Sequence, residues 1–379
     1  MKHKTIITLF IVLQFFTAAT MSMVMALGPS LATLFKIPLN QVPQLNIGFV
    51  LAGLTLPIFG ILADKSGMKS IIILGSFLYS IGCLAAAFTS DPILYFFYRS
   101  LIGFGYYAVL GLISGYSAHL VDEKTLAKLS GYYKIAFSFG VFVSPLLGAM
   151  IISAYGFTIL YGLLGIIGLV ISALLLGIPN IKDPSLHSFK LSDIKIFFKT
   201  PKYRWFMLVA AGLGIPGAFF FNFLNVYLSD IGYNQTMIAN IYTLVGFGSI
   251  LSGLVILWLH RVMKMNQLLL YGSVGVMIAL TLTFMPNYAI FIIGAFLFGL
   301  TYDLVFGLVY PVSALLVDGN KATYISIIAF IMTLFGLSAN VFGPYLYTLG
   351  GFNLLSMIGF SGALVGCLGL LKVYTRKAL

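Results

Sequence analysis

The chain has 379 residues, of which 60% are hydrophobic and only 8% are charged. A soluble protein of this length carries roughly a quarter charged residues, so the composition excludes an ordinary soluble domain. The formal net charge of +12 comes from basic residues that recur in alternate loops, which argues against a nucleic-acid-binding patch. The composition indicates a protein that lies mainly in lipid.

Apolar runs long enough to cross a bilayer recur along the whole chain. A spanning helix takes about 20 residues, and lipid offers no partner to open backbone groups, so each run is predicted to be a helix. The fold class is therefore an all-α polytopic membrane protein. We predict twelve spans, at 5–34, 45–63, 70–89, 92–120, 129–153, 156–178, 204–228, 236–259, 267–285, 288–316, 324–349 and 352–372. The first run exceeds a signal-peptide core, so it is predicted to be a retained helix.

The basic residues predict how the chain crosses the membrane. Of 21 Lys and Arg, Lys36 lies in a loop on one side and Arg99 lies within a span. All the others fall in, or at the ends of, the segments on the opposite side. By the positive-inside rule, both termini are cytoplasmic. We expect a multi-pass protein of the cell membrane whose cytoplasmic loops are 64–69, 121–128, 179–203, 260–266 and 317–323.

A short motif follows the second span, in the segment Gly60-Ile61-Leu62-Ala63-Asp64-Lys65-Ser66-Gly67-Met68-Lys69. It resembles the loop between helices two and three of the major facilitator superfamily of transporters. That resemblance implies a cytoplasmic gating motif of Gly60, Asp64, Gly67 and Lys69, in which the aspartate binds near a helix N-terminus. Met68 departs from the family pattern, which has a basic residue there. An ordinary charged loop is the alternative.

Arg99 lies inside the fourth span, roughly 10 Å deep at 1.5 Å per residue. A charge at that depth usually faces a cavity or a partner. The sequence from Arg99 to Gly103 resembles a motif of the same family that is associated with proton coupling. The alternative is that the long side chain reaches the outer headgroups.

The fifth span contains Gly140-Val141-Phe142-Val143-Ser144-Pro145-Leu146-Leu147-Gly148-Ala149. It resembles the glycine-rich, proline-kinked motif of the drug/proton antiporter branch of the family, with Gly140, Pro145 and Gly148 as its helix-packing residues. That likeness favours export over uptake. A packing motif without bearing on direction is the alternative.

The long polar segment 179–203 joins spans six and seven. Residues 191–199 could form a short helix on the membrane surface, with lysines that meet anionic headgroups, or a solvated linker.

The two halves of the chain repeat. A shift of 196 residues places the fourth span on the tenth, so that Gly103 meets Gly299 and Tyr106 meets Tyr302. Transporters use two such halves to rock about a central site. We predict two six-helix pseudo-symmetric bundles, at 1–178 and 204–379, joined by a cytoplasmic linker at 179–203.

Asp303 is the one acid that we predict to lie deep inside a span. Because burial disfavours a charged carboxylate, this group could load and release a proton. We predict Asp303 and Arg99 to be the proton-coupling residues. The alternative is a carboxylate held by a tyrosine or by Arg99 for structure alone.

Family resemblance also implies a substrate cavity lined by spans one, four, seven and ten. Its polar residues would be Gln14, Tyr106, Asn222, Asn225 and Asp303. Asn222 and Asn225 are three residues apart and share a helix face. Apolar walls with few polar contacts suit a small amphipathic ligand.

The resemblance thus implies a secondary active transporter, with proton-coupled export of small amphipathic compounds by alternating access as the leading hypothesis. Proton-coupled uptake of a small nutrient, such as a sugar, nucleoside or organic acid, is the alternative. An enzyme is not expected, because no catalytic cluster is present. We expect protons, a small-molecule substrate and the lipid bilayer as partners, no nucleic acid, a monomer, no cofactor and no metal. Cys83 and Cys367 lie in apolar runs and imply no disulfide.

Overall fold

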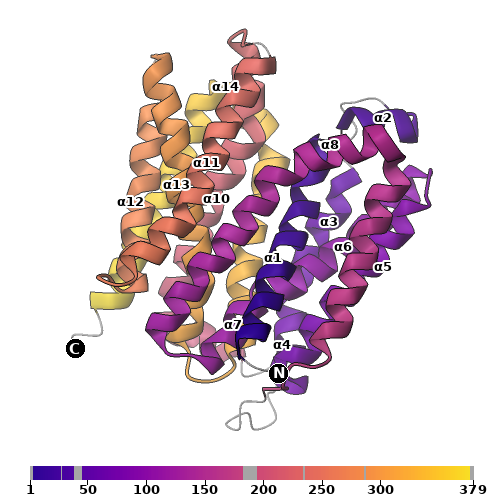
Figure 1. The fold of residues 1–379 in the computed structure, drawn as a ribbon. Coiled ribbons are helices and arrows are strands. Elements are labelled where there is room, and N and C mark those ends of the chain that lie inside the picture. The colour runs from indigo at the N-terminus through magenta and orange to yellow at the C-terminus, as the bar shows by residue number, and fades with distance from the viewer. Residues whose placement is uncertain are drawn as a thin grey trace. The chain divides into compact units, whose positions relative to one another are not determined.

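A computed structural model describes residues 3–26, 28–37, 45–181, 194–233, 235–285 and 287–375. Within these residues the secondary structure is helical, with no strand (Figure 1). Contacts divide the chain into two compact units. Unit 1 comprises Met1–Leu120, Ala136–Ser188 and Gly319–Ser326, and unit 2 comprises Val121–Ile135, Phe189–Asp318 and Ile327–Leu379.

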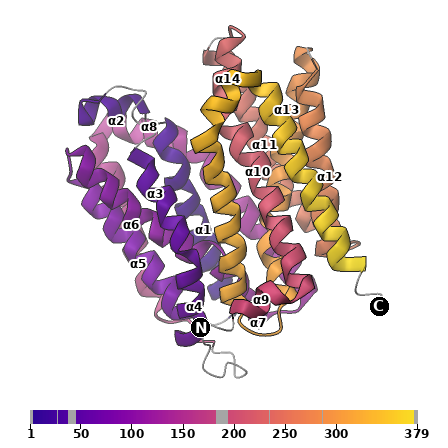
Figure 2. The ribbon, with the colours of Figure 1, turned by 180° about the vertical axis from the view of Figure 1, so that it is seen from behind.

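The helices follow one another along the chain. The first half of the chain forms α1 (His3–Ala26), α2 (Gly28–Phe35), α3 (Ile47–Ala52), the 3₁₀ turn η2 (Gly53–Thr55), α4 (Leu56–Ser66), α5 (Met68–Ala87), α6 (Pro92–Leu110), α7 (Leu112–Leu120) and α8 (Glu123–Leu175). The second half forms α9 (Ile194–Lys199), α10 (Pro201–Asp230), α11 (Gln235–Leu259), α12 (Met265–Thr283), α13 (Tyr288–Leu316) and α14 (Lys321–Thr375). In unit 2, α12 and α13 lie side by side in both views (Figures 1 and 2).

Two glycine breaks divide the longest helices. The backbone of α8 leaves the helical region at Gly156, where φ is 84°. The backbone of α14 leaves it at Gly350 and Gly351, and φ of Gly351 is 62°. Only glycine adopts such positive φ without strain. The break at Gly350 and Gly351 falls between two predicted spans and confirms that boundary. The break at Gly156 falls on the first residue of the predicted span 156–178.

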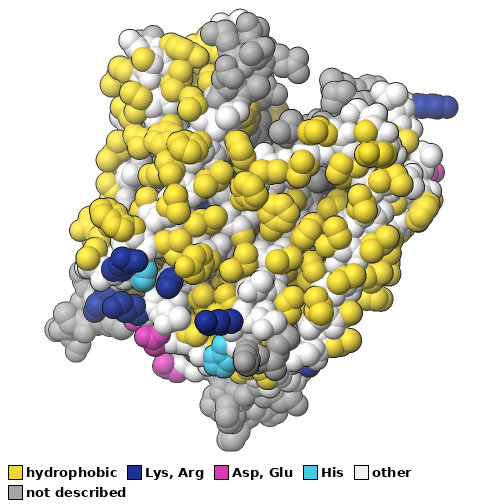
Figure 3. All heavy atoms as spheres, viewed as in Figure 1, with side chains coloured by type: hydrophobic (Ala, Val, Ile, Leu, Met, Phe, Trp, Pro, Cys, Tyr) yellow, Lys and Arg dark blue, Asp and Glu magenta, His cyan; other side chains and the backbone are white. Residues whose placement is uncertain are grey.

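The predicted all-helical membrane fold is confirmed. Among the described residues, eleven helical segments are long and apolar enough to cross a membrane. The first part of α8, before Gly156, occupies the place of the remaining predicted span. Large hydrophobic side chains are exposed on the spans, for example Leu74, Ile166 and Ile293. On the face in Figure 3, apolar side chains cover the helices and most of the visible Lys and Arg gather near one end. This distribution suits a lipid-facing surface.

Short segments of α8 and α14 belong to the unit opposite the rest of their sequence half. Residues 121–135 of the first half lie in unit 2, and residues 319–326 of the second half lie in unit 1. The 196-residue shift places 123–130 on 319–326, so these two segments are equivalent in the repeat. The bundles predicted at 1–178 and 204–379 stay a prediction, and residues 182–193 of the predicted linker lie outside the described residues.

The helix α9 covers the described part of the predicted surface segment 191–199. Phe197 is buried and its ring meets that of Tyr203 at 5.7 Å between centroids, whereas Ile196 and Phe198 are more than half exposed. A helix with one anchored ring and exposed apolar neighbours is compatible with a lipid surface. Its place at the membrane stays a prediction.

The internal repeat extends to a tight helix–helix contact in each half. A Cβ atom on Gly103 would lie 2.6 Å from the carbonyl oxygen of Phe49, and one on Gly299 would lie 2.1 Å from that of Val245. Both partners of the second contact follow those of the first by 196 residues. The two halves therefore use the same backbone approach, which small residues permit in membrane helices.

We expect the substitution Gly299→Ala to destabilise the protein by about 1–3 kcal/mol, because the new methyl group would collide with backbone rather than with a movable side chain. The matched control is Gly336→Ala in α14, where the nearest atom, the Cβ of Ala218, is 3.8 Å away. Thermal unfolding of the two purified variants measures the difference. Equal melting temperatures would contradict the packing described here.

Candidate functional site

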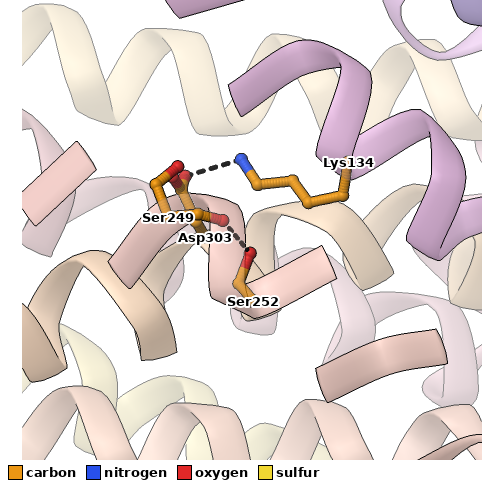
Figure 4. Close-up of polar contacts among 4 residues, drawn as sticks. All are labelled: Lys134, Ser249, Ser252 and Asp303. Atoms are coloured by element: carbon orange, nitrogen blue, oxygen red, sulfur yellow. Dashed lines mark hydrogen bonds and ion pairs between the residues drawn. The ribbon is translucent and has the colours of Figure 1, made fainter. Parts of the chain in front are cut away.

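Asp303 lies in the middle of α13 and is held by two other helices (Figure 4). The Nζ atom of Lys134, on α8, is 2.8 Å from its Oδ1 atom. On α11, the hydroxyl of Ser249 donates to the Oδ2 atom of Asp303, and the hydroxyl of Ser252 donates to the carbonyl oxygen of Ser249 at 2.6 Å. All four residues belong to unit 2. The arrangement is a buried ion pair with a hydroxyl donor on its second carboxylate oxygen.

The two charges differ in exposure. The side chain of Lys134 is 2% exposed, and that of Asp303 is 14% exposed. Breaking a buried pair by removing one partner costs about 3–5 kcal/mol, because the other charge is left uncompensated. The carboxylate is thus the reachable member of a pair whose ammonium lies deeper.

Small residues bring Lys134 to this place. A Cβ atom on Gly131 would lie 3.0 Å from the carbonyl oxygen of Gly253, so α8 and α11 approach closely one turn before the lysine. On α13, a Cβ atom on Gly307 would lie 3.2–3.3 Å from the aliphatic carbons of Lys134. The Nζ atom also lies 5.4 Å from the centre of the Phe306 ring, within cation–π range.

Lys134 was not among the predicted site residues. Its charge was assigned to the loop ends, whereas the structure places this lysine buried within α8, in an ion pair with Asp303. The available signal was a lysine several residues inside the predicted span 129–153, together with a lone acid in another span. In the structure, Asp303 binds Lys134 and Ser249 rather than a tyrosine or Arg99.

Asp64, at the end of α4, binds the first turn of α14. Its carboxylate accepts the backbone N–H groups of Ala322 at 3.2 Å and Thr323 at 2.8 Å, and the hydroxyl of Thr323 at 2.5 Å. The residues belong to unit 1, and Asp64 is buried. An anion at a helix N-terminus satisfies open N–H groups and complements the helix dipole.

The start of α8, equivalent in the repeat, is capped by a residue of its own segment instead. Asp122 accepts the backbone N–H of Thr125 at 3.2 Å. Hydrogen bonds from Thr125, with its side chain as the larger cause, lower the pKa of the Asp122 carboxyl. The two equivalent helix starts therefore receive their acidic caps from different parts of the chain.

The other three residues of the predicted gating motif make tight contacts in unit 1. A Cβ atom on Gly60 would lie 2.7 Å from the carbonyl oxygen of Ala322. Gly67 has a φ of 93° and lies against Asn180. The ammonium of Lys69 donates to the carbonyl oxygen of Leu176 at 2.7 Å. Met68, where the family pattern has a basic residue, is buried.

Arg99 is fully buried in unit 1. One guanidinium nitrogen donates to the Oδ1 atom of Asn46 at 2.6 Å, and another donates to the carbonyl oxygen of Thr20 at 3.4 Å. The guanidinium carbon lies 4.7 Å from the centre of the Phe49 ring. In the described contacts, the guanidinium is therefore surrounded by an amide oxygen, a backbone carbonyl oxygen and an aromatic ring face. The side chain points into the protein rather than toward the outer headgroups.

The predicted helix-packing motif lies in α8. A Cβ atom on Gly140 would lie 2.5 Å from the carbonyl oxygen of Phe15, so α8 and α1 approach closely within unit 1. Gly148 is buried. The helix continues through Pro145, and the side chain of this proline lies outside the described residues.

The polar residues of the predicted cavity fall in both units. Gln14 and Tyr106 are buried in unit 1, and the Gln14 side-chain oxygen accepts no hydrogen bond from the described part of the chain. Asn222 and Asp303 belong to unit 2, where each is partly exposed. The Asn225 side chain lies outside the described residues. The cavity itself stays a prediction.

We expect Asp64→Asn to lower the free energy of unfolding by about 1–3 kcal/mol, because the amide cannot replace a carboxylate that accepts three donors. Lys65→Gln is the matched control, since Lys65 is the exposed neighbour on the same helix. Thermal unfolding in detergent measures both. If the two variants unfold alike, the buried contact contributes no stability.

Known proteins resemble this chain at two levels. Among curated relatives, vacuolar basic amino acid transporter 1 of Saccharomyces cerevisiae is 26% identical over 145 residues, which cover 38% of this chain and 24% of that protein. An uncharacterized MFS-type transporter of Methanocaldococcus jannaschii is 27% identical over 116 residues, or 30% of each protein. The matched part of the chain thus spans less than a third of the length of these relatives.

Solved structures share the fold over nearly the whole chain. The Escherichia coli fucose:proton symporter has a TM-score of 0.82 at 17% identity and covers 96% of this chain and 97% of its own. The human organic anion transporter MFSD10 has a TM-score of 0.81 at 13% identity, with coverage of 98% and 100%. An outward-facing bacterial homologue of the iron transporter ferroportin has a TM-score of 0.82 at 16% sequence identity, and the match covers 98% of this chain and 100% of that protein.

The sequence also matches a family model. The model described as Major Facilitator Superfamily matches residues 10–337, which is most of the chain. The helical membrane fold and the structural likenesses agree with that match. The protein therefore belongs to the major facilitator superfamily.

Proposed function

We propose that this transporter exports small amphipathic compounds in exchange for protons, by alternating access, with Asp303 at the coupling site. Members of its family are membrane transporters, so the protein is a multi-pass membrane transporter and not an enzyme. The observation that carries the proposal is the carboxylate in the middle of α13, held by Lys134 and Ser249. A proton and a substrate group that compete for one such site give exchange.

The ion pair supports a role in coupling because its members come from distant parts of the chain. Lys134 belongs to the segment 121–135, which lies in unit 2 although the rest of α8 lies in unit 1. Any change in the charge of either partner of the ion pair alters the interaction that holds this segment. A local protonation event can thereby bias a larger rearrangement.

Export is proposed from the motif around Gly140, which resembles that of drug/proton antiporters. The tight approach of Gly140 to Phe15 gives this motif a packing role in unit 1. The contacts of Asp64 with α14 support its role as a cytoplasmic latch, together with Gly60, Gly67 and Lys69. Arg99 is proposed as a coupling residue from its motif. The cell membrane and cytoplasmic termini complete the proposal and follow from the loop charges.

The surroundings of Asp303 suit a ligand with an apolar or aromatic body. The rings of Phe298 and Tyr302 stack at 5.3 Å between centroids on the same helix, and Phe221 of α10 meets both. Aromatic faces supply apolar area and attract cations. One relative is named for transport of basic amino acids, which also carry a positive charge.

Uptake of a small nutrient is the second candidate. The observation that favours it is the polar set next to Asp303, since Lys134, Ser249 and Ser252 add groups that a polar substrate such as an organic acid could use. The fucose:proton symporter shares the fold, at an identity too low to carry its substrate over.

We expect Asp303→Asn to abolish proton-coupled transport, because the amide keeps the shape of the side chain but cannot carry the charge. The variant should be less stable, because Lys134 loses its counter-ion, but still folded. The assay uses proteoliposomes that contain a pH-sensitive dye, with an imposed proton gradient and added candidate compounds. Asp318→Asn, at an exposed acid near the end of the same helix, is the matched control.

Full retention of coupled transport in Asp303→Asn would remove Asp303 from the mechanism. Proton movement driven by a nutrient rather than by amphipathic compounds would replace export with the uptake candidate. Unaltered size-exclusion behaviour and a cooperative thermal unfolding transition of the variant show that it is folded.

A further inference from the structure

The carboxylate of Asp303 is already neutralised by the buried ammonium of Lys134. A proton-exchange site that uses the carboxylate alone would present an open acid to the proton and the substrate in turn. Here an incoming cation must first displace a cation that belongs to the protein. The identity of the proton-carrying group depends on what becomes of Lys134 at that moment.

Charge balance determines whether Lys134 keeps its proton when a ligand binds. If a cationic ligand binds Asp303, the Lys134 ammonium loses its counter-ion while its side chain remains 2% exposed. A desolvated ammonium without a counter-ion is strongly disfavoured, whereas a neutral amine can be buried at a much smaller cost. Release of one proton from the lysine restores neutrality. Lysine readily makes this change when buried, whereas arginine does not.

We propose that Lys134 carries the exchanged proton and that the substrate is an organic cation that takes the place of its ammonium on Asp303. In this step the Lys134 ammonium and the Asp303 carboxylate react with a ligand cation. The products are a neutral Lys134 amine, a ligand–carboxylate ion pair and one proton released to water. Asp303 stays ionised throughout. The inference rests on the proposed proton-coupled export and names its substrate class and its proton carrier.

Relative exposure supports this order of events. Asp303 is 14% exposed and Lys134 only 2%, so a ligand reaches the carboxylate before it reaches the lysine. The Lys134 side chain lies along Gly307 and beside the ring of Phe306, surroundings that accept a neutral amine. The hydroxyl of Ser249 donates to the other carboxylate oxygen and keeps the carboxylate in place during the exchange.

In the described contacts, the helices packed around Asp303 present aromatic rings and hydroxyls to it, and no second acid that could pair with a bound cation. On α13, the neighbouring ionisable group is Tyr302, and α11 contributes the hydroxyls of Ser249 and Ser252. From α10, Gly217 and Phe221 face Tyr302. From α12, Gly272 and Gly275 face α13. A cation between such rings gains cation–π attraction in addition to the ion pair.

The test measures binding of tetraphenylphosphonium to the full-length protein in detergent. This amphipathic cation is permanently charged and holds no proton of its own, so any released proton comes from the protein. For wild type, we expect the affinity to rise about tenfold per pH unit between about pH 6 and 8, because one proton leaves for each cation bound. The pH change on binding in weakly buffered solution independently measures the number of protons released for each cation bound.

Two substitutions of the lysine separate its charge from its proton. In Lys134→Ala the pH dependence disappears, and the affinity at about pH 6 exceeds that of wild type by at least about tenfold, because no ammonium competes. In Lys134→Arg the competing charge is permanent, so binding is weak at every pH. The arginine variant keeps the ion pair and thereby controls for folding. Asp303→Asn binds poorly at every pH.

The outcomes separate this inference from the proposed function. If Lys134→Ala retains the wild-type pH slope and proton release, the proton resides elsewhere and the inference is wrong, while proton-coupled export stands. If wild type binds benzoate with proton uptake and does not bind tetraphenylphosphonium, an organic anion replaces the cation and the inference is again wrong. If transport in vesicles ignores the proton gradient, the proposed function itself fails.

Discussion

A charge taken out of water must find compensation inside the protein, and the architecture depends on that constraint. Only 8% of the residues are charged, and three charges that lie within the helix packing are compensated in three different ways. Asp303 meets an ammonium, Asp64 meets open N–H groups at a helix start, and Arg99 meets side-chain and backbone oxygens and a ring face. Each solution joins elements that are far apart in sequence, so each fixes tertiary structure as well as charge.

Glycine makes these distant encounters possible. Gly60 lets the end of α4 reach the first turn of α14, and Gly131 lets α8 approach Gly253 of α11 just before Lys134. At Gly60 a Cβ atom would collide with the facing backbone, and at Gly131 it would crowd it, so the absence of a side chain permits the close approach. The electrostatic contacts therefore depend on positions that carry no chemistry of their own, and substitutions there would act on the site indirectly.

Much of the fold follows from local properties of the sequence. Span length and the helix breaks at Gly156 and Gly351 depend on neighbours along the chain, which composition reports directly. The 196-residue repeat is visible when the sequence is compared with itself. The pair of Lys134 with Asp303 depends instead on packing between helices far apart in sequence. No local pattern specifies it, and the lysine was grouped with loop charges. The partner of Asp64 was predicted only through family resemblance, because the sequence at the start of a helix does not specify which distant carboxylate binds its open N–H groups.

The exchanged segments make the two halves of this duplicated chain mutually dependent. In unit 1 the donors that compensate Asp64 come from 319–326, and in unit 2 the ammonium that compensates Asp303 comes from 121–135. Either half by itself would retain an acid within its helices and lack the group that compensates its charge. Separate expression of the two halves would therefore leave each with an unbalanced carboxylate, and only their combination restores charge balance in both.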